Sequence, residues 1–394
     1  MFPDQTTFLA GPAIFTGMEV LVGHGILIQN GIVSDVLPSD KAPRGTYRIN
    51  LPDDSFLVPG FFDAQVNGAG GLLFNDAPNE KTARHMDRIL RTFGVTGFLP
   101  TLITDNPEKM RQAADTILHL VDDKESSISG LHLEGPFINP IKRGCHNDDF
   151  VRCPEEEDIR FLERLGLALQ EKGTRLLLTA APETMPEVFA RHLVRSGVVL
   201  SMGHSEATYE QALTALRHGF SGFTHLGNAM SPVRGQDPGL LGAALLSAPG
   251  TWGGLIADGI HVHPALVRLF LREAQNKGCK PFLVSDSMPL LGTGDSVFSL
   301  YGTPVFRRNG RLETENGTLA GADISILHGL KWVLSMTDIK REEAWRMASL
   351  YPCQFLGLDQ SMGHIRKGMR ANLTLLSQDM DILATWVNGV STSL

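Results

Sequence analysis

The chain has 394 residues, of which 42% are hydrophobic and 20% are charged, as in ordinary globular proteins with a large core and room for a second, smaller domain. A formal net charge of −8 argues against nucleic acid or an anionic membrane as the main partner, although an anionic small molecule needs only a local group of donors. The cysteines are scattered without a Cys-x-x-Cys pair, and neither a signal peptide nor a membrane-spanning stretch is recognisable, so we expect a cytoplasmic protein without a disulfide framework.

Both ends of the chain have a β-rich pattern. Near the N-terminus, Ile26–Gln29 and Ile32–Val36 are short apolar segments separated by Asn30-Gly31, a dipeptide typical of tight hairpin turns. Near the C-terminus, Ile382–Val387 is followed by a second Asn-Gly turn at 388–389. We therefore expect residues 1–57 and 362–394 to form one small sheet domain beside a larger domain at 58–361.

The larger domain alternates strands with single helices. Apolar residues recur at helical spacing over Met86–Phe93, and a strand-like stretch, Gly97–Thr101, follows. The same helical spacing returns over Tyr209–Leu216 and again after Pro264. Such alternation favours a β/α barrel or a doubly wound sheet.

Short apolar runs in this domain lead into side chains that can hold a metal or move a proton. They are Ile128–Leu133 before Glu134, Val198–Met202 before His204, Phe220–Phe223 before His225, and Phe282–Val284 before Asp286. Apolar runs of this length are typical of buried parallel strands. In a β/α barrel the chemistry gathers at one end of the strands, so these residues predict one site and favour the barrel.

Taken singly, each of these residues has a structural explanation, such as a helix cap for Asp286. Together, Glu134, His204 and His225 form the ligand set of catalytic zinc, which also suits ferrous iron. Asp286 can take a proton from a metal-activated water and deliver it to the leaving group. The sequence therefore predicts a metal-dependent hydrolase.

Two other histidine motifs lie near these positions. His132 alternates with Glu134 along the same strand, and we expect it to be packed beneath the site rather than to bind the metal. His261 and His263 alternate along an extended segment, so only one of them can readily face the site, and we favour His261.

An ordered series of motifs runs through nearly the whole chain. The series comprises Pro59-Gly60-Phe61-Phe62-Asp63, Leu99-Pro100-Thr101, His132–Pro136, Gly203-His204-Ser205, Thr224–Met230, Ile256–His261, Asn316-Gly317-Thr318-Leu319, Ala348–Pro352 and Lys367–Leu373. In this order the motifs closely resemble those of the N-acetylglucosamine-6-phosphate deacetylases of the amidohydrolase superfamily.

This resemblance implies a distorted (β/α)8 TIM-like barrel with a small β-sandwich domain formed by both termini. It also implies hydrolysis of the acetamido group of N-acetylglucosamine-6-phosphate, or of its galacto epimer, by a homodimer. By position, Glu134, His204 and His225 match the metal ligands, and Asp286 matches the general base and acid. The positions that match substrate contacts are Cys145, His146, Asn228, Ala229, His261, Leu319, Ala320 and Gly321.

Two departures from the family pattern affect the site. Gln65 and Asn67 replace the His-x-His of many amidohydrolases, and because amides are poor metal ligands we expect one tightly bound ion, Zn²⁺ or Fe²⁺. Gln236 stands where relatives usually have an arginine that reaches the substrate phosphate of the neighbouring subunit, with Arg234 two residues earlier. Either Arg234 replaces that arginine, or the phosphate is held more weakly, or the preferred substrate differs.

Other functions remain as alternatives. Hydrolysis of cyclic amides, as in dihydroorotases, usually requires the His-x-His and a bridging modified lysine, neither of which is found. A sugar-phosphate sensor without catalysis is disfavoured by the presence of Asp286 together with all three ligands. The stretch Thr293–Gly310 has no functional explanation from the sequence, and either a mobile flap or a plain insertion would suit it.

Overall fold

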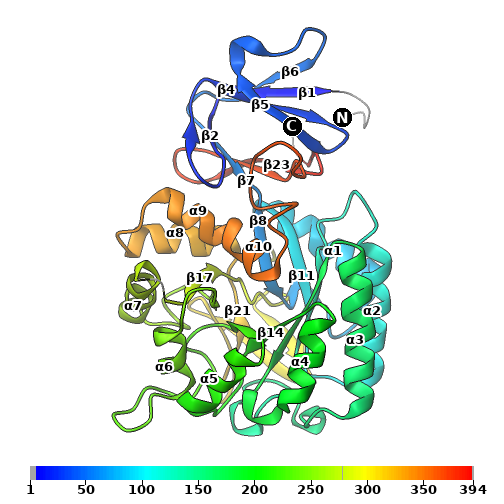
Figure 1. Cartoon of the computed structure of the whole chain (residues 1–394), viewed down its shortest axis with the longest axis vertical. Coiled ribbons are helices and arrows are strands. Elements are labelled where there is room, and N and C mark those ends of the chain that lie inside the picture. Colours follow the sequence, from blue (N-terminus) through cyan, green and yellow to red (C-terminus); the bar gives the residue numbers. More distant parts are fainter. Residues whose placement is uncertain (1–5, 277, 393–394) are drawn as a thin grey trace.

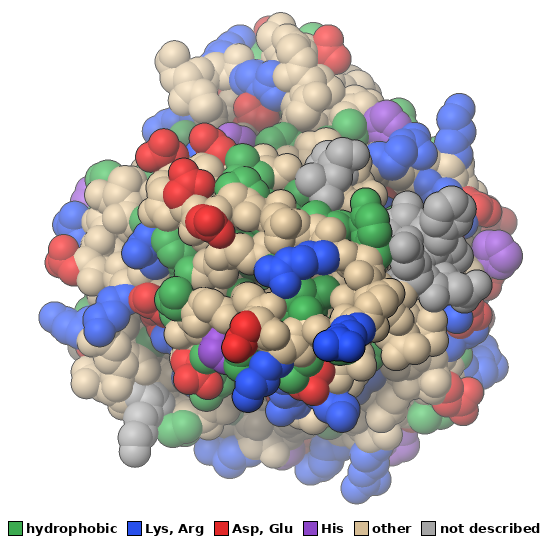
Figure 2. All heavy atoms as spheres, turned by 90° about the horizontal axis from the view of Figure 1, so that it is seen from above, with side chains coloured by type: hydrophobic (Ala, Val, Ile, Leu, Met, Phe, Trp, Pro, Cys, Tyr) green, Lys and Arg blue, Asp and Glu red, His purple; other side chains and the backbone are tan. Residues whose placement is uncertain are grey.

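The computed structural model describes residues 6–276 and 278–392. Figure 1 shows two parts, a barrel of strands surrounded by helices and a smaller sheet-rich unit at one end of it. Among the described residues, no helix combines the length and the apolar character needed to cross a membrane. Acidic and basic side chains are interspersed on the face seen in Figure 2, as on an ordinary solvated surface.

A parallel sheet with the spatial order β17-β16-β15-β14-β13-β12-β11-β8 forms the barrel. In chain order its strands are β8 (Phe61–Val66), β11 (Val95–Ile103), β12 (Gly130–Glu134), β13 (Arg175–Ala180), β14 (Val198–Met202), β15 (Phe220–Phe223), β16 (Trp252–Leu255) and β17 (Lys280–Leu283). Each strand neighbours its predecessor, as β/α units require. The ring nearly closes, because the backbone N–H of Asp286, just after β17, donates to the carbonyl of Gln65 in β8 at 3.0 Å. The predicted barrel is confirmed.

Helices cover the outside of the barrel (Figure 1). They are α1 (Glu80–Arg91), α2 (Pro107–Leu120), α3 (Glu156–Glu171), α4 (Glu187–Arg195), α5 (Tyr209–Arg217), α6 (Gly239–Leu246), α7 (Pro264–Gln275), α8 (Ile326–Met336), α9 (Arg341–Ala348) and α10 (Leu350–Leu356), with short 3₁₀ turns η1 (Ser39–Lys41), η2 (Pro140–Lys142), η3 (Asp148–Phe150) and η4 (Pro182–Thr184). Local chemistry sets their ends. The Asn79 side chain caps α1, Thr208 and Gln211 form a capping box at α5, and Pro264 opens α7.

The two ends of the chain build a small two-sheet unit. One sheet has the order β5-β4-β1-β6 and the other the order β24-β23-β22-β7-β2-β3. The strands are β1 (Thr7–Ala10), β2 (Ala13–Phe15), β3 (Val20–Leu21), β4 (His24–Gln29), β5 (Ile32–Pro38), β6 (Tyr47–Asn50), β7 (Phe56–Pro59), β22 (Leu373–Leu376), β23 (Ile382–Val387) and β24 (Val390–Ser391). Leu9, Ile26 and Leu57 from the first end pack with Leu373 and Trp386 from the second in one buried cluster. The predicted sandwich from both termini is therefore confirmed.

The stretch Thr293–Gly310 belongs to a folded antiparallel sheet. That sheet comprises β18 (Val297–Leu300), β19 (Thr303–Arg308), β20 (Arg311–Thr314) and β21 (Leu319–Ala322), and a short hairpin of β9 (Gly68–Ala69) and β10 (Leu72–Leu73) lies at the end of β8. Leu300, Val305 and Leu312 of the sheet pack against Leu73 of the hairpin. The Tyr301 hydroxyl also donates to a main-chain carbonyl after β11 at 2.8 Å, so this sheet is anchored to the barrel.

Some predicted boundaries were wrong. β12 begins at Gly130 rather than Ile128, because Gly130 has a φ of 142° that interrupts the extended chain, and Ile128 makes only an isolated bridge. β17 ends before Val284. α1 ends at Arg91, since the chain turns at Gly94 with a φ of 81°, so Phe93 lies outside the helix.

Candidate metal centre and substrate pocket

The four predicted chemical residues lie at the same end of the barrel. Glu134 is the last residue of β12, whereas His204, His225 and Asp286 come shortly after β14, β15 and β17. These last three have φ angles of 48°, 31° and 50°, in a left-handed region that is uncommon for residues other than glycine. Such strained backbone clusters at functional sites, where the surrounding structure holds it in place.

Three of these side chains converge on one point. Oε1 of Glu134 lies 3.0 Å from Nε2 of His204 and 3.0 Å from Nε2 of His225. The two Nε2 atoms are themselves 3.0 Å apart, and all three side chains are buried. Two imidazole nitrogens and a carboxylate oxygen thus meet with little access to water.

The hydrogen bond on the far side of the His204 ring leaves a lone pair directed into this cluster. Nδ1 of His204 lies 2.8 Å from the carbonyl oxygen of Lys142, which can only accept, so Nδ1 carries the hydrogen and Nε2 of the neutral ring has a free lone pair. That lone pair faces Glu134. Burial opposes ionisation of this carboxyl, but the adjacent imidazoles of His204 and His225 bring its pKa well below the usual range. A divalent cation would relieve the opposed electron pairs, and the donor set is that of a catalytic zinc centre.

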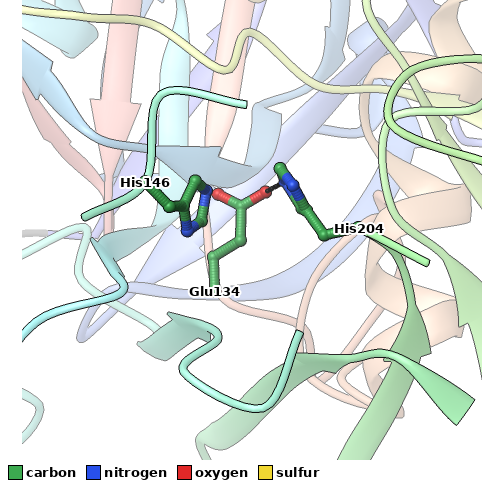
Figure 3. A group of neighbouring side chains, drawn as sticks. All are labelled: Glu134, His146 and His204. Carbon is green, nitrogen blue, oxygen red and sulfur yellow. Dashed lines mark hydrogen bonds and ion pairs between the residues drawn. The ribbon is translucent and has the colours of Figure 1, made fainter. Parts of the chain in front are cut away.

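His146 is a further candidate ligand in this cluster. Glu134, His146 and His204 offer ligand atoms that all lie within 4.8 Å of one another, and Figure 3 shows the carboxylate of Glu134 between the two rings. The backbone N–H of Thr104, however, donates to Nδ1 of His146 at 3.4 Å. Nδ1 is then an acceptor and the ring hydrogen lies on Nε2, which suits a hydrogen-bond donor better than a metal ligand.

The carboxylate of Asp286 is held beside this cluster by two amides. Its Oδ1 accepts hydrogen bonds from Nε2 of Gln65 at 3.1 Å and from Nδ2 of Asn67 at 2.7 Å. Burial and the nearby charge of Glu134 raise the pKa of Asp286 to about 6. A carboxyl with a pKa near neutrality can both accept and return a proton, which is the requirement for general acid–base catalysis.

Comparison with known proteins identifies the family of this chain. A model of the Amidohydrolase family matches residues 56–392, and a model of the NagA composite domain matches residues 9–52. This chain belongs to the amidohydrolase family. The resemblance inferred from the sequence motifs is confirmed.

Individual relatives of this amidohydrolase are similar over almost their whole length. An N-acetylgalactosamine-6-phosphate deacetylase of Shewanella sp. (strain ANA-3) is 36% identical over 93% of this chain and 90% of the relative. An N-acetylglucosamine-6-phosphate deacetylase of Haemophilus influenzae is 33% identical over 95% of this chain and 96% of the relative. The crystal structure of N-acetylglucosamine-6-phosphate deacetylase from Pasteurella multocida superposes with a TM-score of 0.91 at 32% identity, covering 99% of this chain and all of that one.

A pocket of about 390 Å³ opens above the cluster of Glu134, His204 and His225. Among the residues predicted to contact substrate, those that line it are Cys145, His146, Asn228, Ala229, His261, Leu319 and Gly321. Ala320 lies next to this lining but is buried in the apolar cluster of the antiparallel sheet. Arg234 and Gln236 are exposed on the loop between β15 and α6 and do not line the pocket of their own chain.

His261 is oriented by a buried carboxylate. Its Nδ1 lies 2.6 Å from Oδ2 of Asp258, and its Nε2 is buried without a hydrogen-bond partner among the described residues. The neighbouring His263 instead caps α7, by accepting a hydrogen bond from the N–H of Ala265 at 3.2 Å. Of this pair, it is therefore His261 that lines the pocket.

His132 is packed beneath the site, as its position predicts. It is buried between the hydroxyls of Thr101 and Thr179, at 3.2 and 2.8 Å. Burial lowers its pKa to about 4, so the ring is neutral. His132 does not line the pocket above the site.

Lys142 is a pocket residue that the sequence reasoning missed. It brings a cationic side chain to the lining, where Nζ pairs with Glu206 at 2.8 Å, and its carbonyl orients His204. The only signal in the sequence is its position three residues before Cys145. A Lys-Arg pair in a loop is usually no more than a solvated surface.

Proposed function

We propose that this amidohydrolase hydrolyses the acetamido group of N-acetylglucosamine-6-phosphate to glucosamine-6-phosphate and acetate, a reaction of amino-sugar catabolism. The observation that carries the proposal is the convergence of Glu134, His204 and His225 beside Asp286 at the base of a pocket. The Shewanella and Haemophilus influenzae relatives, which align with more than 90% of this chain, are amino-sugar-phosphate deacetylases, which supports this substrate class.

In this proposal Glu134, His204 and His225 hold one divalent ion, Zn²⁺ or Fe²⁺. The ion supplies Lewis acidity toward the acetamide carbonyl and toward water. Asp286 accepts the proton of the attacking water. It then delivers that proton to the amine nitrogen, since an unprotonated amide nitrogen is a poor leaving group.

Polar side chains around the pocket orient the sugar. We assign Nε2–H of His146 and Nε2 of His261 to the developing oxyanion or to a sugar hydroxyl. The remaining contacts that we assign to the substrate are Cys145, Asn228, Ala229, Leu319, Ala320 and Gly321. They lie at or beside the pocket lining.

The phosphate contact and the assembly are proposed together. Because Arg234 and Gln236 are exposed outside their own pocket, we assign Arg234 to the substrate phosphate of a second subunit in a homodimer, with Gln236 beside it. We further propose a cytoplasmic location, and domain boundaries at 1–57 with 362–394 for the sandwich and 58–361 for the barrel.

A second candidate is deacetylation of N-acetylgalactosamine-6-phosphate. It is favoured by one observation, the 36% identity to the Shewanella deacetylase of that substrate. The two substrates differ only in the configuration of one hydroxyl. Because the acetamido group and the phosphate are the same in both sugars, the same metal ligands and the same base would serve both reactions.

Acetate release from three substrates tests the proposal. The substrates are N-acetylglucosamine-6-phosphate, N-acetylgalactosamine-6-phosphate and unphosphorylated N-acetylglucosamine, with protein of known metal content. We expect the gluco phosphate to have the highest kcat/KM. Faster turnover of the galacto phosphate would establish the second candidate, and faster turnover of the unphosphorylated sugar would reject a phosphate-binding role for this site.

A further inference from the structure

Gln65 and Asn67, which replace the His-x-His motif, both donate hydrogen bonds to Asp286 in this structure. Gln65 is in β8 and Asn67 follows it, so both side chains point to the same side of the strand. Both are buried, with 2% of each residue exposed. Each donates to the same oxygen of Asp286, at 3.1 Å from Gln65 and 2.7 Å from Asn67.

The backbone fixes these three residues in register. The N–H of Asp286 donates to the carbonyl of Gln65, and the N–H of Asn67 donates to the carbonyl of Ser287, both at 3.0 Å. These bonds join the chain at the ends of β8 and β17, the first and last strands of the barrel. The carboxylate of Asp286 is therefore held by its main chain and by two side-chain donors at once.

The two donors leave the second oxygen of Asp286 free. Among the hydrogen bonds of the described residues, both bonds to this carboxylate end on Oδ1 and none reaches Oδ2. Asp286 also lines the pocket. Oδ2 is thus the oxygen available for proton transfer to a bound molecule.

Asn67 has an additional free atom. An ionised carboxylate only accepts hydrogen bonds, so Nδ2 must face Asp286 and Oδ1 must face away from it. Oδ1 of Asn67 is buried without a partner among the described residues, and Asn67 lines the pocket. A buried acceptor without a partner suits a ligand that brings a donor, and the reacting group of the proposed substrate carries an amide N–H.

We propose that Gln65 and Asn67 are positioning residues for Asp286, which occupy Oδ1 and reserve Oδ2 for proton transfer, and that Oδ1 of Asn67 accepts the N–H of the substrate acetamide. This arrangement places the leaving nitrogen beside the group that protonates it. The inference rests on the proposed function, in which Asp286 is the general base and acid.

The test combines single variants with a double-mutant cycle on Asp286. Gln65→Leu removes one donor from Asp286, and we expect kcat to fall by roughly 10–100-fold with little change in KM, as for a misplaced catalytic group. Asn67→Leu removes the donor and the acceptor, so we expect a similar fall in kcat together with a higher KM. In both variants the acid limb of the kcat profile should move to higher pH, because the lost donors favour the ionised carboxylate.

The decisive comparison is made in the Asp286→Asn background. If Gln65 acts through Asp286, Gln65→Leu should have almost no further effect on the residual rate of Asp286→Asn. An equal loss in both backgrounds would overturn the inference and assign Gln65 a general structural role. If Asp286→Asn itself retained near-normal activity, the role of Asp286 would fail, whereas a wild type that released no acetate from either amino-sugar phosphate would overturn the proposed function, so these failures are distinguishable.

Asn372→Leu is a matched control for the loss of a buried amide. Asn372 is buried, and its side chain bonds to Thr96 and Asn388 at 3.0 and 2.8 Å, outside the pocket lining. We expect this control to lower the thermal unfolding temperature without moving the pH profile. Metal content, measured for every variant, should stay at that of the wild type, and a loss of metal in Gln65→Leu would contradict a role confined to Asp286.

Discussion

Replacing Asp286 with asparagine changes the charge of the base but almost nothing of its shape. The amide oxygen of the new side chain can still accept from Gln65 and Asn67, which donate to Oδ1 of the native carboxylate. Loss of a general base or acid typically costs a factor of about 10²–10⁴ in rate. Because Asp286 is proposed to act both as base and as acid, we expect kcat to fall toward the upper end of that range, with the metal retained.

The same substitution should stabilise the metal-free protein. The pKa of Asp286 is about 6 in the fold against an ordinary 3.8, so as the pH rises the unfolded chain releases this proton first, and stability falls between these two values. Above pH 6 the ionised carboxyl then costs the fold about 3 kcal/mol, which asparagine removes.

Three measurements on wild type and Asp286→Asn check both effects. They are acetate release, metal content by elemental analysis, and thermal unfolding of the metal-free proteins at pH 8 and at pH 4. We expect an inactive variant that is loaded with metal and, when stripped of it, more stable than wild type at pH 8, with most of that advantage lost at pH 4. Near-normal turnover would refute the role of Asp286. A difference in unfolding temperature that does not depend on pH would refute the raised pKa of Asp286 in the folded protein.

Other properties of the site lead to further expectations. The kcat should fall at acid pH, because protonated Asp286 cannot accept a proton from water. We expect the midpoint of this fall at pH 6 or below, since the pKa of Asp286 is about 6 and a bound cation favours its ionised form. A kcat that rises below pH 6 would contradict this. Glu134→Gln should weaken metal binding, measured by competition with a chelator. We expect a larger loss than the roughly 10–100-fold that is typical when a residue hydrogen-bonded to a metal ligand is removed. Unchanged affinity would remove Glu134 from the ligand set. Arg234→Ala should raise KM for the phosphorylated sugar and leave KM for the unphosphorylated one unaltered, while Gln236→Ala has a smaller effect; the opposite order would assign the phosphate to Gln236. His132→Leu should lower the thermal unfolding temperature, because the Thr101 and Thr179 hydroxyls lose their buried partner. The variant should still bind the metal. Loss of the metal at unchanged stability would make His132 a ligand.

The barrel and the position of its chemistry could be predicted because both depend on short-range patterns. Buried parallel strands appear as apolar runs, and a polar residue at the end of such a run, such as Glu134 or His225, stands out against it. A barrel places all such ends together whatever lies between them in the chain. The hairpin at Asn30-Gly31 was equally readable, since both residues take positive φ angles, 52° and 77°.

The parts that could not be predicted depend on contacts between distant segments. The contact between Lys142 and His204 joins residues 62 apart in sequence, and nothing local marks it. The amide donors to Asp286 come from residues about 220 positions away, so Gln65 and Asn67 appeared only as missing ligands. The antiparallel sheet, by contrast, could have been recognised from Asn309-Gly310. This dipeptide forms the hairpin turn from β19 to β20, with positive φ angles of 52° and 77° like those of Asn30-Gly31.

The central claim, one metal ion that serves a deacetylase, is tested most directly by titrating metal-free protein with Zn²⁺ or Fe²⁺ while acetate release from N-acetylglucosamine-6-phosphate is measured. With Glu134, His204 and His225 as the ligands, activity should rise linearly and stop at one equivalent per chain, and a chelator should abolish it. A plateau at two equivalents would mean that Gln65 and Asn67 do not exclude a second ion. Acetate release that persists without metal, or fails to appear at any loading with either amino-sugar phosphate, would contradict the account.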